Sequence, residues 1–147
     1  MAILRYTASL DTTIANAFKE NLSTRATGSN MGMSDTLEAF SIYGQTSSSV
    51  DGKSSELSRI LIKFDATGSS GIAADRTAGT IPASGSVSFY LRMFNAAHSY
   101  TVPENFKMIV SAVSGADWQE GYGLDMETYK DTGVTNWISA STGNAWV

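Results

Sequence analysis

The stretch SRILIKF, residues 58 to 64, decides the fold class of this chain. Its side chains alternate between two sides with a period of two residues, which is the pattern of a half-buried β-strand. One side carries Arg59, Leu61 and Lys63, and the other carries Ile60, Ile62 and Phe64. Because the second set is wholly apolar, we expect it to point to the core.

Other segments on both sides of this strand show similar patterns between turn-forming residues. The further strands that we expect are residues 3–8, 12–18, 37–43, 86–94 and 105–113. The segment IAADRTAG, residues 72–79, predicts one or two helical turns that Gly79 ends, with Asp75 and Arg76 exposed. These six strand segments belong to the seven or eight short strands that we expect, and so many strands with long polar loops predict an all-β fold. The expected architecture is one β-sandwich or jelly-roll domain over residues 1–147, with at most one short helix.

Three polar, glycine-containing stretches predict connections rather than core elements. GSNMGMSDT, residues 28–36, is a predicted loop, and GQTSSSVDGKSS, residues 44–55, is a predicted exposed connection with a turn at Asp51-Gly52. Residues 117–147 hold three tryptophans among glycines, hydroxyl residues and acids without a regular period. We expect this last segment to be loop-rich and packed on the sandwich or on a neighbouring subunit.

The composition excludes several classes of protein. The chain has 147 residues, 16% charged, against about 25% in an average soluble protein, so we expect neighbours to cover part of its surface. Its net charge of −4 and its ten scattered basic residues argue against nucleic-acid binding. It has no cysteine, no secretory signal pattern and no apolar run that approaches the length of a membrane span, so we expect neither disulfides nor a membrane partner.

The order of these segments resembles the DNRLRE-type β-sandwich domain from about Ala8 to Trp146. The motifs that carry the resemblance are NMGMSDTLE, SRILIKFD, GSVSFYLRMF, DWQEG and TNWISAS. The runs MAILRYTASLDTTIANAF and GLDMETYKDTGVTNWISAS also resemble virion structural proteins of tailed phages, including those that infect marine cyanobacteria. Proteins of this kind share a role in assembly and not a chemical reaction.

The resemblance implies a non-enzymatic structural protein on the surface of the phage particle. We expect a capsid decoration or cement protein that docks on the head lattice and reinforces it. Its partners would be other copies of itself and the major capsid protein or another virion protein. The alternative is a tail, neck or fibre component whose β-sandwich binds carbohydrate.

The family pattern continues beyond the point at which this chain ends, at Trp146-Val147. We therefore expect an incomplete sheet edge that another copy or another virion protein covers, because unpaired edges promote association. Loops that close the edge within the chain are the alternative. For the terminal segments themselves, pairing in the domain's own sheet and clamping between subunits are both open.

Six residues at the ends of the chain and in the aromatic C-terminal segment are the candidate interface. They are Ile3, Tyr6, Tyr122, Trp137, Trp146 and Val147. Aromatic side chains anchor protein interfaces or stack on sugars. For Trp118 and Trp137 the favoured interpretation is structural, closing the open end of the sandwich, whereas Trp146 is expected to act as an interface anchor.

Catalytic and metal sites find little support in the sequence. His98 is the single histidine, and no cysteine or G-x-S-x-G motif accompanies it, so we expect no catalytic residue and no cofactor. Several carboxylates lie close together between Asp117 and Asp131, but their spacing is not that of an EF-hand loop. We interpret them as a solvated acidic loop and expect no bound metal, with a calcium site as the alternative.

Overall fold

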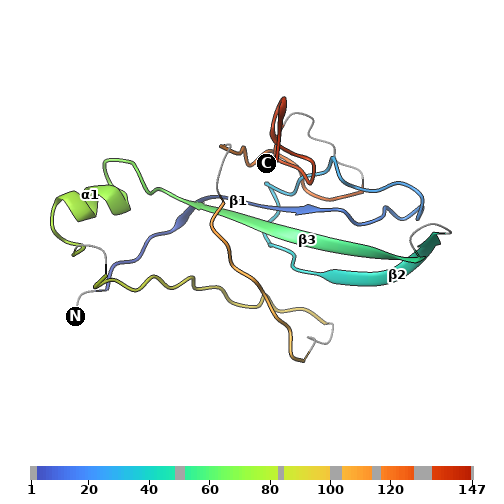
Figure 1. Cartoon of the computed structure of the whole chain (residues 1–147), viewed down its shortest axis with the longest axis horizontal. Helices are drawn as coiled ribbons and strands as arrows, with labels where there is room; N and C mark the ends of the chain where they lie inside the picture. The colour runs from blue at the N-terminus through green and yellow to red at the C-terminus, as the bar shows by residue number, and fades with distance from the viewer. Residues whose placement is uncertain are drawn as a thin grey trace.

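A computed structural model describes residues 3–48, 52–82, 85–99, 104–113, 117–127 and 134–146 (Figure 1). Its elements are β1 (Ala8–Ala15), β2 (Ser41–Ser48), β3 (Gly52–Phe64), α1 (Ile72–Thr77), β4 (Ser139–Ser141) and β5 (Asn144–Ala145). The regular structure is mostly strand, with one short helix, which confirms the prediction of a small all-β fold at this level. Within the described residues, no helix has the length and apolar character needed to cross a bilayer.

The long strand β3 organises the main sheet, in which the order is β1-β3-β2 and both pairings are antiparallel. The C-terminal half of β3 pairs with β1, so that Leu61 lies opposite Thr12. The N-terminal half pairs with β2, where Ser55 lies opposite Tyr43. A second, two-stranded sheet joins β4 to β5. The predicted strand 58–64 is therefore confirmed, and it is part of a longer one.

The polar stretch 44–55 differs from its prediction as an exposed connection. Most of it is paired strand, since β2 continues to Ser48 and β3 begins at Gly52. The backbone N–H of Thr46 also donates to the hydroxyl of Ser54 at 3.1 Å. Small hydroxyl residues make this hairpin look like a loop in the sequence, but backbone pairing does not depend on apolar side chains.

The start of the chain also differs from its prediction as two strands. Residues 3–7 are not strand, and a single strand, β1, covers Ala8–Ala15. Its last four residues are buried, whereas Ala8 and Ser9 are exposed. Predicted strands 3–8 and 12–18 are thus replaced by one strand whose C-terminal half enters the core.

The core lies on the side of β3 opposite to the expected one. Leu61 is buried in a cluster with Ile14, Trp118 and Ala140, whereas Ile60, Ile62 and Phe64 are only partly buried. The two charged neighbours of Leu61 on this side are tolerated because each has a partner there. The Arg59 guanidinium lies 4.0 Å from the centroid of the Trp137 ring, and Lys63 Nζ lies 2.7 Å from the Asp117 carboxylate.

The predicted strands 86–94 and 105–113 are wrong as strands. Residues 87–97 and 106–113 belong to no helix, strand or turn and follow an extended path in Figure 1, and in the described chain no residue of 85–97 or 104–113 makes a hydrogen bond. In Figure 1 these segments run on the other side of β3 from the C-terminal hairpin. The part of the chain that the structure describes therefore contains five strands, fewer than expected, and the second layer of the predicted sandwich is not formed by paired strands.

Two other predictions agree with the structure. Residues 28–36 form a loop, and α1 ends before Gly79, which adopts a positive φ of 76°. Arg76 is exposed as expected, but Asp75 is partly buried because the Tyr6 hydroxyl donates a hydrogen bond to it.

Candidate interaction surface

Asn30 is a fully buried junction that places the C-terminal segment on the sheet. Its Nδ2 donates to Thr12 Oγ1 and to the carbonyls of Glu120 and Thr135, and its Oδ1 accepts from the N–H groups of Gly32 and Gly123. One amide thus joins the loop 28–36 to β1 and to both described parts of the C-terminal segment. Because every polar atom of this side chain has a partner, its burial does not leave an unsatisfied group.

A second buried polar residue, Glu56, supports the hairpin of β2 and β3. Its carboxylate accepts hydrogen bonds from the Phe18 N–H at 2.8 Å, from the Gln45 side chain at 3.2 Å and from the Ser54 hydroxyl at 3.3 Å. These bonds satisfy a charge that is costly to bury alone. These contacts therefore give Glu56 a role in holding the fold together.

The three tryptophans serve the fold. Trp118 is 6% exposed and belongs to the core cluster, and Trp137 and Trp146 pack against that cluster from outside. Trp146 also donates from Nε1 to the Asn136 carbonyl at 2.7 Å. Trp118 and Trp137 thus contact the core, and Trp146 has a contact within the chain in addition to its predicted role at an interface.

The other predicted interface residues lie in different places. Ile3 and Tyr122 are exposed, Tyr6 is partly buried, and Val147 lies outside the described residues. Figure 1 shows the N-terminal segment near α1 and the C-terminal hairpin above the middle of the sheet. The structure therefore does not bring the five described candidates together into one surface.

Tyr6 fastens the N-terminal segment to α1. Its hydroxyl donates to Asp75 Oδ2 at 2.6 Å. The hydrogen bond to this carboxylate, helped by partial desolvation and by the negative charge of Asp75, raises the pKa of Tyr6 to about 12. The N-terminal segment is thus held by a contact inside the chain.

The carboxylates of the C-terminal segment point to separate partners. Lys63 bonds to Asp117 and lowers the pKa of that carboxyl group. Glu120 accepts from the Asp11 N–H at 2.7 Å, and Glu127 accepts from the Glu20 N–H at 3.0 Å. Asp131 lies outside the described residues. Among the residues that are described, no three His, Asp or Glu side chains are grouped as metal ligands would be.

Large exposed apolar side chains are concentrated on the two extended segments, residues 85–97 and 104–113, which we call the apolar segments. Tyr90 is 88% exposed, and Phe94 and Ile109 are each 92% exposed. The other large apolar side chains exposed on these segments are Phe89, Leu91, Met93, Phe106, Met108, Val110 and Val113. Such a concentration on backbone without hydrogen-bond partners indicates an interaction surface.

A groove of about 1020 Å³ separates the apolar segments from β3. Its walls include β3 residues 57–64, Leu91, Met93 and residues 106–113. Native interiors are close-packed and hold few voids larger than a water molecule, so this layer is not packed as a finished core.

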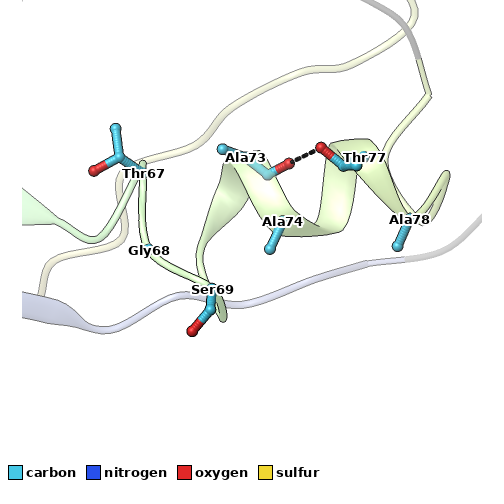
Figure 2. A pocket seen from close by; sticks show the side chains of 7 residues that line it. All are labelled: Thr67, Gly68, Ser69, Ala73, Ala74, Thr77 and Ala78. Carbon is cyan, nitrogen blue, oxygen red and sulfur yellow. Dashed lines mark hydrogen bonds between the residues drawn. The ribbon is translucent and has the colours of Figure 1, made fainter.

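A smaller hollow of about 460 Å³ lies beside α1 (Figure 2). Its lining is small and uncharged, from Thr67, Gly68, Ser69, Ala73, Ala74, Thr77 and Ala78. The Thr77 hydroxyl is engaged with the Ala73 carbonyl at 2.9 Å, as Figure 2 shows. Converging charged or polar groups of the kind that orient a ligand do not line this hollow. The apolar segments are therefore the stronger candidate for a functional surface.

Sequence reasoning treated the apolar segments only as sandwich strands, although a signal for their role was present. In SVSFYLRMF, one side carries Val87, Phe89, Leu91 and Met93, and the other side also carries two aromatic residues, Tyr90 and Phe94. A strand with aromatic residues on both sides is stable only when other parts of a protein pack against both of its sides. Asn30 and Glu56 were missed because a buried polar residue looks in a sequence like any other polar residue.

Comparison of the chain with family models, with curated proteins and with solved structures finds no match.

Proposed function

We propose that this protein is a non-enzymatic structural subunit of a phage virion, and specifically a decoration or cement protein on the capsid surface. The observation that carries the assembly role is the exposure of the apolar segments without backbone partners. The assignment to a virion is supported by the sequence motifs that resemble tailed-phage structural proteins.

The amount of apolar surface favours an assembly role. The ten large side chains exposed on the apolar segments present on the order of 1,000 Å², since a single aromatic side chain offers roughly 150–250 Å². The largest apolar patch on a typical monomer is about 300–600 Å². Because apolar burial is favourable by about 25 cal/mol per Å², a partner that covers this surface gains enough to offset the entropic and desolvation costs of association. A protein with this much exposed apolar surface is suited to an assembly in which neighbouring subunits cover it.

On a capsid, such a subunit would act mechanically. Many copies would each bury a specific contact of roughly 800 Å² per partner against the major capsid protein or against one another. The summed contacts would reinforce the head lattice. The low charge of the chain, 16% of its residues, fits a surface that is partly covered.

The alternative, a tail, neck or fibre component that binds carbohydrate, has weaker support. Sugar recognition by stacking needs accessible aromatic faces. Trp118 is buried, Trp137 stacks under Arg59, and Trp146 packs on the core cluster. Four exposed aromatic residues instead lie among aliphatic ones on the apolar segments, an environment that favours a protein partner, whereas Tyr43 and Tyr122 are exposed elsewhere.

A rebinding experiment tests the proposal. The purified protein is added to phage heads from which decoration proteins have been removed, and in parallel to immobilised host polysaccharide. We expect saturable binding to heads and stronger resistance of decorated heads to heat. Retention on polysaccharide with no binding to heads would instead support the carbohydrate-binding alternative.

A further inference from the structure

We infer that the partner that covers the apolar segments is a second copy of this chain, which pairs with the first through residues 86–94 as antiparallel strands about a twofold axis. This inference rests on the proposed assembly role, because it names the occupant of the same surface. It adds a defined geometry to that role, with Tyr90 on the axis.

The backbone of residues 86–94 is ready for such pairing. Residues 87–94 follow an extended path in Figure 1, and in the described chain the N–H and C=O groups of residues 86–94 make no hydrogen bonds. Unpaired extended backbone is a template for another strand. In a twofold-symmetric dimer, residues 86–94 of one copy pair with residues 86–94 of the other. The two strands run antiparallel, and each offers the other the same donors and acceptors.

The side-chain pattern restricts the register to those in which a residue lies opposite its own copy. Opposite residues of an antiparallel pair lie on the same side of the sheet, so a twofold axis perpendicular to the sheet must pass beside a residue and not between two. Tyr90 is the midpoint of residues 86–94. With Tyr90 opposite its own copy, Phe89 lies opposite Leu91 of the second copy, and Val87 lies opposite Met93. One side of the new sheet then becomes continuously apolar.

The charge pattern favours the same register. Arg92 is the only charged residue between 86 and 94. In the register centred on Tyr90 it lies opposite Ser88, and it is about 13 Å along the strand from its own copy, at about 3.3 Å for each residue. A register centred on Arg92 would place two like charges directly opposite each other, which destabilises a sheet.

The area available is sufficient for a dimer. The exposed side chains of Phe89, Tyr90, Leu91, Met93 and Phe94 provide several hundred Å². Apolar side chains of residues 104–113 extend the same surface. Together they reach the roughly 800 Å² per partner of a specific interface. The exposed area is therefore large enough for a specific contact between two copies, in which strand pairing satisfies the backbone groups and neighbouring side chains of the two copies pack together.

The absence of cysteine from the chain allows a direct test. Any disulfide in a single-cysteine variant must join two copies, and it needs Cα atoms within about 7 Å. We expect Tyr90→Cys to form a disulfide-linked dimer under mild oxidation. Phe94→Cys, equally exposed, should not do so, because the two copies of residue 94 would be about 26 Å apart along the strand.

Tyr43→Cys is the second control, since Tyr43 is 73% exposed but lies on β2. Equal cross-linking of all three variants, or cross-linking at residue 94 or 43 and not at 90, would overturn the inference. The native mass in solution should be that of a dimer, and Tyr90→Glu should shift it to that of a monomer by raising the dissociation constant at least about tenfold. Tyr43→Glu should leave the dimer intact.

The same samples separate this inference from the proposed function. A dimer linked at residue 90 that does not bind stripped heads would uphold the inference and remove the capsid role. A native protein that is monomeric and still binds heads would overturn the inference and leave the capsid role in place.

Discussion

The side-chain amide of Asn30 donates a hydrogen bond to the backbone carbonyl of Thr135 at 3.0 Å, and both residues are fully buried. The two residues are 105 positions apart in the chain. The contact therefore joins the first loop of the protein to its C-terminal segment. It is made by a residue type that is common in surface turns, and it acts beside the apolar contact that Trp118 and Ala140 make with the main sheet.

Replacing Asn30 with alanine should destabilise the protein strongly. The change leaves the N–H of Gly123 and the carbonyls of Glu120 and Thr135 without their partner in a buried site. We expect the free energy of unfolding to fall by about 3 kcal/mol or more, since each buried unsatisfied group costs about 1–3 kcal/mol. Urea denaturation followed by tryptophan fluorescence measures this. Asn144→Ala, at an exposed bond to Ser141, is the matched control and should cost less than about 0.5 kcal/mol.

The glycine at position 123 should be intolerant of any side chain. A Cβ atom there would overlap the backbone carbonyl of Asn30, so the junction would have to open. We expect Gly123→Ala to lower the melting temperature by several degrees or more and to reduce soluble yield, because 1 kcal/mol corresponds to about 2–8 °C in domains of this size range. Gly28→Ala places its Cβ in open space and should change the melting temperature little. Equal melting temperatures for the two variants would contradict this assignment.

The bond between Tyr6 and Asp75 should be visible in a pH titration. The pKa of Tyr6 is raised to about 12, while an unperturbed tyrosine has a pKa of about 10. Its contribution to stability is therefore fully present below about pH 10 and is lost as the pH rises towards 12. Absorbance at the phenolate band should show a late-titrating tyrosine that Tyr6→Phe removes and that Asp75→Ala shifts to lower pH. A titration that neither variant alters would show that this bond does not form in solution.

Trp146 should contribute to folding as well as to its predicted role at an interface. Trp146→Phe keeps an aromatic ring on the core cluster but loses the Nε1 bond to Asn136, so we expect a cost of about 1 kcal/mol. Trp146→Ala also loses packing and should cost about 2–3 kcal/mol. Thermal melts measure both variants, and rebinding to stripped heads measures assembly. If Trp146 is also an interface anchor, as its sequence position predicts, Trp146→Ala should reduce rebinding more than its loss of stability explains. A parallel loss in the two assays would remove that interface role.

The sequence predicted β3, α1 and the loop 28–36 well because each depends on local patterns. Alternation identifies SRILIKF as a strand, and Gly79 can end a helix with a positive φ whatever lies around it. The same reasoning failed for residues 44–55 and 86–94, in opposite directions. The first stretch is polar but pairs as a hairpin, and the second alternates but has no strand partner among the residues that the structure describes. Pairing is a property of two segments, and one segment's composition does not determine it.

The sequence by itself therefore determined the β class, the central strand, the short helix, the low charge and the loop-rich C-terminal segment. Only the tertiary structure decided which side of β3 is the core, because Ile60 and Leu61 are equally apolar and the position of Trp118 selects between them. It also decided that Asn30 and Glu56 are buried, since burial of a polar group depends on partners that lie far away in the chain. Finally, it showed that residues 86–94 are unpaired, because a strand needs hydrogen-bond partners and none lies beside this segment in the described parts of the chain.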